Sequence, residues 1–357
     1  MAKKKIAVLF GGVSSEYEVS LRSVSSVLRN IDSELFSVIP IGITKRGRWL
    51  YYPGPVELIE NDTWHKSPDC VPAIISPDRI SGGIIRFAED GSAVSFERPD
   101  AVIPVLHGKN GEDGTMQGLF ELAGIPYVGP GVLASAVCMD KAVANAMMDY
   151  YGVPHCEWTS LTSAEAEDIE TAAEQFEKRV AYPIIVKPAS AGSSVGVSKA
   201  HNREELRAGI LAAFAHDGKV VLERCVVGRE IECAVLGNEK PIASHVGEIL
   251  PPEGEMYTYE EKYSAVSVTG LAIPASLPQS LEDEIRETAI RAYRMFGCRG
   301  LSRVDFFVEN GRPLLNEINT LPGFTSISMY PKLMEHFGIS AKELITRLIE
   351  LGLGEER

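Results

Sequence analysis

The sequence contains no apolar run that approaches the ~18 residues needed to cross a membrane. It also lacks a segment that concentrates Lys and Arg, and its formal net charge is −14. Binding to nucleic acid depends on such clusters, because counterion release supplies much of the affinity. The six cysteines include no Cys-x-x-Cys pair and indicate no zinc site. We therefore expect a cytoplasmic protein with reduced thiols that binds neither membrane nor nucleic acid.

Two common nucleotide-binding motifs are also missing. The Gly/Ser-rich segment 189–196 lacks the Gly-Lys-Ser/Thr ending of a Walker A loop, and Gly11–Gly12 does not begin a dinucleotide fingerprint. The basic residues Lys3–Lys5 precede the apolar run Ile6–Phe10, which superficially has the form of a signal peptide. That run is too short for a signal peptide, so we interpret it as a buried first strand.

The length of 357 residues predicts two or three domains, and a hydrophobic content of 45% is ample for their cores. Apolar strand patterns and a helical pattern over 19–28 indicate an α/β fold at the start of the chain. Segment 50–98 is rich in Pro and Gly, and we interpret it as hairpins without recognisable chemistry. Turn residues over 124–131 predict a boundary, and a later helix has Ser280 as its N-cap and Gly297 as its end. The predicted strands are 6–10, 36–43, 101–106, 184–187 and 220–223. One further helix is predicted over 203–214.

A hairpin is predicted where two strand-like runs flank Asn310-Gly311. Because side chains alternate along a strand, Arg303 and Asp305 share one face, and Glu317 and Asn319 also share one. Two carboxylates and an amide oxygen are hard ligands that suit Mg²⁺ carrying substrate phosphates. A hairpin with one solvated polar face explains the same alternation equally well.

The length of the hairpin loop decides whether these side chains meet. A two-residue turn would place Asp305 and Glu317 on opposite faces of the hairpin. A three-residue loop over 310–312 pairs Asp305 with Glu317 instead. The same register pairs Arg303 with Asn319. We therefore predict the three-residue loop.

A strand that ends at Lys187 leads into a loop of small residues, 188–196. Backbone N–H groups and serine hydroxyls in such a loop can surround phosphate oxygens, while Lys187 offers a positive charge. Glu223 and Glu230 follow at the next strand, where carboxylates could accept hydrogen bonds from a ribose. Taken alone, an ordinary turn, a surface lysine and exposed acids are the simpler explanations.

Six motifs in order make the chain resemble the D-alanine:D-alanine ligases of the ATP-grasp superfamily. The motifs are Gly11–Ser20, Leu106–Gly114, Met139–Lys141, Lys187–Gly196, Glu261–Tyr263 and Asn316–Ser326. The resemblance covers nearly the whole chain and implies an ATP-grasp fold with an N-terminal Rossmann-like domain. The implied three domains are 1–130, 131–223 and 224–357.

The resemblance also implies a reaction and its partners. ATP would phosphorylate the carboxylate of one D-alanine, and the amine of a second would displace phosphate from the acyl phosphate, giving the dipeptide of peptidoglycan. Two Mg²⁺ or Mn²⁺ ions would assist, and the protein would be a homodimer.

Roles for individual residues follow from the same resemblance. The ATP-binding residues would be Lys141, Lys187, Ser194, Glu223, Glu230 and Lys262. The catalytic residues would be Glu16, Ser193, Tyr263, Arg303 and Gly323. The remaining substrate-binding residues would be His107, Ser328 and Met329. The metal ligands would be Asp305, Glu317 and Asn319.

Two features of the sequence bear on the second substrate. Related ligases join D-alanine to D-serine or D-lactate, and those that confer resistance carry arginine where Met329 stands. Tyr263 is also typical of the dipeptide makers, so we expect D-alanine to be preferred. A nucleotide-binding regulatory protein and an ATP-grasp ligase for another carboxylate are the alternatives. Glu16 argues against the latter, because its implied role is amino-acid capture.

Overall fold

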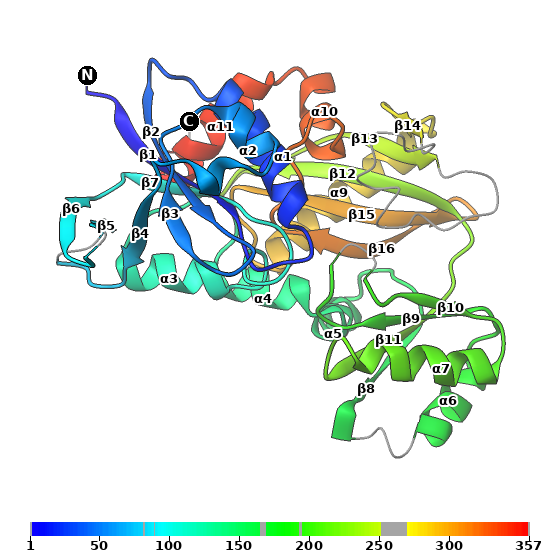
Figure 1. The fold of residues 1–357 in the computed structure, drawn as a ribbon. Coiled ribbons are helices and arrows are strands. Elements are labelled where there is room, and N and C mark those ends of the chain that lie inside the picture. Colours follow the sequence, from blue (N-terminus) through cyan, green and yellow to red (C-terminus); the bar gives the residue numbers. More distant parts are fainter. Residues whose placement is uncertain are drawn as a thin grey trace.

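Three β-sheets organise the chain (Figure 1), as seen in a computed structural model that describes residues 2–80, 83–88, 90–164, 169–192, 195–250 and 270–355. No helix within these ranges is both long and apolar enough to cross a bilayer.

The first sheet has seven strands in the order β6-β5-β4-β3-β2-β1-β7. β1 pairs in parallel with β2 and β7, and the other pairs are antiparallel. The strands are β1 (Lys4–Gly11), β2 (Phe36–Ile43), β3 (Trp49–Tyr51), β4 (Val71–Ser76), β5 (Gly83–Phe87), β6 (Ala93–Glu97) and β7 (Ala101–Val105). The helices beside it are α1 (Tyr17–Asn30), α2 (Val56–Glu60), the 3-10 helix η1 (Trp64–Lys66) and α3 (Thr115–Ala123). The three predicted strands and the hairpins within 50–98 are thus confirmed.

The central strand β1 is an uninterrupted apolar run because both of its faces are covered. Ile6 to Phe10 are fully buried, and successive side chains enter two different hydrophobic clusters. Gly11 ends the strand with φ +85°, and a Cβ there would lie 2.1 Å from the carbonyl oxygen of Ile43. Glycine is therefore required where the chain turns towards α1.

The second sheet has four antiparallel strands in the order β10-β9-β11-β8, and lies apart from the other two in Figure 1. Its elements are β8 (Trp158–Thr162), α6 (Ile169–Glu177), β9 (Ile184–Pro188), β10 (Ser198–Ala200), α7 (Arg203–Phe214) and β11 (Lys219–Arg224). It is reached through α4 (Val132–Met139) and α5 (Lys141–Tyr151). Helix α7 has the predicted bounds. It begins after Asn202, whose side chain caps the helix by accepting from the Glu205 N–H at 3.0 Å.

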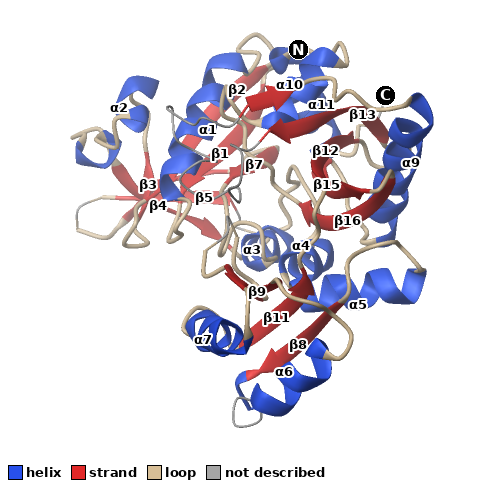
Figure 2. Cartoon of the chain, turned by 90° about the vertical axis from the view of Figure 1, so that its right-hand side faces the viewer, coloured by secondary structure: helices blue, strands red, loops and turns tan. Residues whose placement is uncertain are grey.

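The third sheet has five antiparallel strands in the order β14-β13-β12-β15-β16, and α9 packs against it (Figure 2). The elements are β12 (Arg229–Leu236), β13 (Ile242–Leu250), β14 (Gly270–Ala272), α9 (Gln279–Met295), β15 (Leu301–Glu309), β16 (Arg312–Asn319), α10 (Met329–His336) and α11 (Ala341–Gly352). Gly297 adopts φ +69° after α9, as predicted for its end. The predicted Ser280 N-cap is wrong, because the N-cap is Pro278 and the helix begins two residues earlier than predicted.

The helices α10 and α11 return to the first sheet, where α11 contacts α1 and β7 (Figure 1). Leu344 and Leu348 of α11 belong to the same buried cluster as Val8 and Val24. Lys342 reinforces this contact through an ion pair of 2.9 Å with Asp32. The first and third sheets are therefore joined by one hydrophobic core.

The β15–β16 hairpin confirms the predicted pairing but corrects its cause. Asp305 faces Glu317 and Arg303 faces Asn319, as expected. The predicted three-residue loop is wrong, because Glu309 pairs with Arg312 across a two-residue Asn310-Gly311 turn.

Both turn residues have positive φ, 52° and 76°, as a type I′ turn requires. The register shifts between Asp305 and Phe306, so Asn316 is the extra residue of a β-bulge. The bulge produces the one-residue change in strand register that we had predicted from a longer loop. It lets Leu315 and Ile318 stay buried while Glu317 faces the other way.

Candidate functional site

A polar cleft brings together residues that are far apart in the sequence. Its polar or predicted residues are Glu16, His107, Glu112, Lys141, Gly192, Glu232, Arg303, Glu317, Asn319, Gly323, Ser328 and Met329. They come from the loops after β1, β7 and β9, from the start of α5, from β12, β15 and β16, and from the segment that leads into α10. Most of the predicted site residues that the structure describes thus line one cleft.

The predicted metal ligands lie together on the β15–β16 hairpin. Asp305 accepts hydrogen bonds from Arg303 Nε and Nη2 at 2.7 and 2.6 Å, and from Asn319 Nδ2 at 2.9 Å. Glu317 lies opposite Asp305. Across the described part of the chain, no group of three or more His, Cys, Asp or Glu side chains is placed to hold a metal. The predicted set is a smaller one, two carboxylates and one amide, and its hard oxygens fit Mg²⁺ or Mn²⁺.

Arg303 has a second carboxylate partner that the sequence analysis missed. Its Nε lies 2.9 Å from Glu232 Oε2. Glu232 is buried on β12 and pairs with Asp305 across the sheet. Strand alternation places Glu230 and Glu232 on one face, and this signal could have identified it. Two acids therefore orient the guanidinium in the cleft.

Lys141 connects the small-residue loop 188–196 with the β15–β16 hairpin. Its Nζ donates to the carbonyl oxygen of Ala191 at 3.1 Å and lies 3.5 Å from Glu317 Oε2. Its backbone N–H donates to the carbonyl oxygen of Ala189 at 2.9 Å. This lysine therefore holds the start of the loop beside the carboxylates.

Lys187 and Glu223, predicted as separate ATP contacts, form an ion pair with 2.6 Å between Nζ and Oε2. Burial alone would lower the pKa of Lys187, but the Glu223 carboxylate more than offsets this and raises it. Asn145 of α5 also donates to Glu223 at 3.3 Å. Glu230 lies on β12, paired with Ile249 and Phe307. These four residues are not among those that line the cleft, although the charge of Glu317 in the cleft acts on Lys187. Asn145 is a contact that the sequence did not suggest.

His107 is buried, and both of its ring nitrogens have partners. Nδ1 lies 3.1 Å from the carbonyl oxygen of Leu321, and Nε2 lies 3.0 Å from Ser23 Oγ. Burial lowers the pKa of His107 to about 4, so the ring is neutral at physiological pH. Ser23 Oγ also accepts from the Phe324 N–H at 3.1 Å. His107 thus links α1 to the segment before α10.

Glu16 and Glu112 bring two carboxylates into the cleft. Glu16 is buried directly before α1, and its backbone N–H donates to Ser14 Oγ at 3.1 Å. Glu112 Oε2 accepts from the Gly108 N–H at 2.7 Å. Desolvation, and then the charge of Glu16, raise the pKa of Glu112 to about 8. The motif Leu106–Gly114 contained Glu112, but the sequence analysis gave it no role.

The predicted second-substrate residues begin α10. Ser328 Oγ lies 2.7 Å from Thr325 Oγ1 and accepts from the Thr325 N–H at 3.1 Å. Met329 is buried, and a Cβ at Gly247 would lie 2.6 Å from its sulfur. A Cβ at Gly323 would lie 2.8 Å from Ser328 Oγ. This end of the cleft is therefore tightly packed.

Four predicted site residues lie outside the described residues. They are Ser193, Ser194, Lys262 and Tyr263.

The antiparallel second and third sheets, with a lysine-bearing loop facing a carboxylate hairpin, have the architecture of the ATP-grasp fold. Two family models match the chain, "D-ala D-ala ligase N-terminus" over residues 5–130 and "D-ala D-ala ligase C-terminus" over residues 147–350. The chain belongs to the D-alanine–D-alanine ligase family, and it is an ATP-dependent ligase.

Relatives match along their whole length. The D-alanine–D-alanine ligases of Acetivibrio thermocellus and Caldicellulosiruptor bescii are each 48% identical, over 98% and 100% of this chain and 96% and 97% of theirs. Among solved structures, the VanG D-Ala:D-Ser ligase of Enterococcus faecalis is 42% identical with a TM-score of 0.89, covering 98% of this chain and 100% of that one. The D-alanine-D-alanine ligase of Coxiella burnetii is 35% identical with a TM-score of 0.84, over 99% and 96%.

Proposed function

We propose that this protein uses ATP to join two D-alanine molecules into D-alanyl-D-alanine, the dipeptide of peptidoglycan precursors. One observation carries the proposal: a single cleft unites Glu16 with Lys141, Arg303 and the Glu317 carboxylate. A buried carboxylate suits the capture of an amino-acid ammonium, whereas the other groups suit phosphoryl transfer. The family and its full-length relatives support the same activity.

The reaction proceeds in two displacements. A carboxylate oxygen of the donor D-alanine attacks the γ-phosphorus of ATP, and ADP leaves. The amine of the acceptor D-alanine attacks the resulting acyl carbon and loses a proton, and the tetrahedral adduct expels phosphate. Arg303 and the backbone N–H of Gly323 stabilise the oxyanion of this adduct. Their positions are supported by the ion pairs of Arg303 and by the close packing at Gly323.

Glu16 anchors the donor ammonium, and His107 lies near the donor carboxylate. Because both nitrogens of His107 already have partners, its part is to hold α1 against the segment 321–324. For Ser193 and Tyr263, which lie outside the described residues, the proposed role is to hydrogen-bond Glu16 and so to help keep water from the acyl phosphate.

Residues around the loop bind the nucleotide and its metal. The ATP-binding residues are Lys141, Lys187, Ser194, Glu223, Glu230 and Lys262. Asp305, Glu317 and Asn319 would hold two Mg²⁺ or Mn²⁺ ions, which neutralise phosphate charge when bound. The pairing of Asp305 with Glu317 supports this set. Glu232 would still hold Arg303 if Asp305 served as a metal ligand.

D-alanine is the proposed acceptor in preference to D-serine or D-lactate. Ser328 already hydrogen-bonds Thr325, and Met329 is an apolar neighbour that offers no donor to a hydroxyl. The likeness to the VanG D-Ala:D-Ser ligase makes D-serine the principal alternative.

Phosphate release measured with D-alanine, L-alanine, D-serine and D-lactate tests the proposal. We expect release that depends on D-alanine and Mg²⁺, with kcat/KM for D-alanine as acceptor above that for D-serine. A higher kcat/KM for D-serine would make this chain a D-alanine:D-serine ligase. No release with any of these compounds would favour a nucleotide-binding regulatory protein.

We also propose domain boundaries at 130 and 223, a homodimeric assembly and a cytoplasmic location. The separate core of the second sheet supports the boundary at 223, and the six free cysteines suit a reducing compartment.

A further inference from the structure

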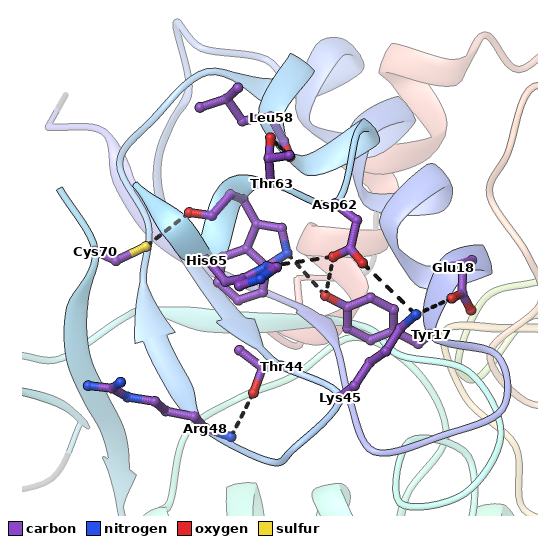
Figure 3. A network of polar contacts seen from close by, with 11 residues as sticks. Tyr17, Glu18, Thr44, Lys45, Arg48, Leu58, Asp62, Thr63, His65 and Cys70 are labelled. Atoms are coloured by element: carbon purple, nitrogen blue, oxygen red, sulfur yellow. Dashed lines mark hydrogen bonds and ion pairs between the residues drawn. The ribbon is translucent and has the colours of Figure 1, made fainter. Parts of the chain in front are cut away.

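A network of side chains surrounds the residue that follows Glu16 (Figure 3). The hydroxyl of Tyr17 donates to Asp62 Oδ1 at 2.7 Å, and Trp64 Nε1 donates to the same hydroxyl at 3.2 Å. Asp62 and Trp64 belong to segment 50–98, for which the sequence indicated no chemistry. This segment therefore contacts the residue that is next to Glu16 in the chain.

The aromatic part of the network is fixed in place. Tyr17 and Trp64 are 2% and 0% exposed. The Trp64 ring lies 4.9 Å from that of Phe10, and a Cβ at Gly42 would lie 2.2 Å from it. Because the core leaves these rings no room to shift, the Tyr17 hydroxyl can hold Asp62 in one position.

Lys45 is the cation of the network. It forms an ion pair with Glu18, lies 3.9 Å from Asp62 Oδ2 and sits 4.8 Å above the Tyr17 ring (Figure 3). Lys45 and Glu16 also line one cavity. A lysine released from these contacts could neutralise Glu16 and so compete with a substrate ammonium.

Glu16 depends on its neighbours for its direction. It lies at the N-terminus of α1, and its side chain makes no capping hydrogen bond to that helix. Tyr17 is the next residue and anchors the first turn of the helix, so it fixes the backbone from which the Glu16 side chain extends. We infer that Asp62 is a positioning residue for the donor amino acid, because Tyr17 holds the Asp62 carboxylate where it restrains Lys45 beside Glu16. This inference rests on the proposed role of Glu16.

Steady-state kinetics of full-length variants test the inference. Asp62 has φ +51°, so Asp62→Gly removes the carboxylate without backbone strain. Asp62→Gly and Tyr17→Phe should each raise the KM for donor D-alanine by about two- to tenfold, the effect of one lost hydrogen bond. The KM for ATP should not change. Asp62→Asn keeps an acceptor for the Tyr17 hydroxyl but loses the charge that faces Lys45, so its donor KM should stay raised.

Tyr293→Phe is the matched control, since it removes a buried hydroxyl that donates to the Gly237 carbonyl oxygen at 2.7 Å on the distant α9. It should lower Tm without changing the donor KM. The same outcome for Asp62→Gly and Tyr17→Phe would reduce the network to a structural role and overturn the inference.

Glu16→Gln separates the inference from the function on which it depends. A raised donor KM in Glu16→Gln, with none in Tyr17→Phe, refutes the positioning role alone. An unchanged donor KM in Glu16→Gln refutes the proposed role of Glu16 itself. Tyr17→Phe keeps the buried ring, so it provides the test even where Asp62→Gly does not fold.

Discussion

His107 has a defined protonation state as well as a defined position. A carbonyl oxygen can only accept, so the Nδ1 proton is directed at Leu321. In the neutral ring Nε2 then accepts from Ser23, whose oxygen accepts in turn from Phe324. One chain of hydrogen bonds therefore connects α1 with the segment before α10.

This arrangement predicts a loss of stability in acid. The pKa of His107 is about 4 in the folded protein and 6.5 as the ordinary value, so the unfolded chain binds a proton first as pH falls. The stabilisation is complete above about pH 6.5 and is lost as pH falls towards 4. His107→Gln keeps a donor and an acceptor but does not titrate.

Urea unfolding of wild type and His107→Gln at several pH values measures this contribution. We expect the difference in free energy of unfolding, wild type minus variant, to fall by roughly 3 kcal/mol between pH 7.5 and pH 4. A difference that is independent of pH would show that the histidine is not buried in its neutral form.

Among the secondary-structure elements, the β15–β16 hairpin gives the sharpest test. Deleting Asn316 would produce a regular ladder in which Asp305 still faces Glu317 and Leu315 still faces Phe306. We therefore expect this variant to fold and to keep its Mn²⁺ affinity in the presence of ADP, measured by calorimetry. Deleting Leu314 also shortens β16 by one residue. In that variant the Asn316 side chain would lie in the core, opposite Phe306.

The Leu314 deletion should lower the free energy of unfolding by about 2–4 kcal/mol relative to the Asn316 deletion, because a polar group replaces a buried leucine. Equal stability of the two deletions would contradict the assignment of the bulge.

The hairpin also shows how far sequence reasoning reaches. Strand alternation and the requirement that the predicted metal ligands share one face were enough to predict that Asp305 meets Glu317. They did not distinguish a longer loop from a bulge, since either shifts the register by one residue.

Contacts between separate elements were harder to predict than strands and helices. Periodicity identified most elements, and the motifs identified most residues of the cleft. Asn145 and Asp62 were missed, because their contacts form only when another element packs beside them. Glu232 was also missed, although it shares a strand face with Glu230 and alternation could have identified it.

For the whole molecule, the shared core of the first and third sheets predicts coupled unfolding. Leu348 of α11 is buried against the first sheet, and Leu348→Ala should cost about 2–5 kcal/mol. Hydrogen exchange should then become faster in β1 and β7 as well as in α11. The control Leu206→Ala lies in the separate core of the second sheet and should affect that sheet alone. Unchanged exchange in β1 after Leu348→Ala would contradict the coupling.

The return of α11 to the first sheet has a consequence for protein synthesis. The strands of this sheet leave the ribosome early, but the helix that covers part of its core is translated after all three sheets. The nascent first sheet therefore exposes apolar surface until α11 has been translated, whereas the second sheet has its complete core before then. The second sheet can therefore fold before α11 is translated, but the first sheet can complete its core only afterwards.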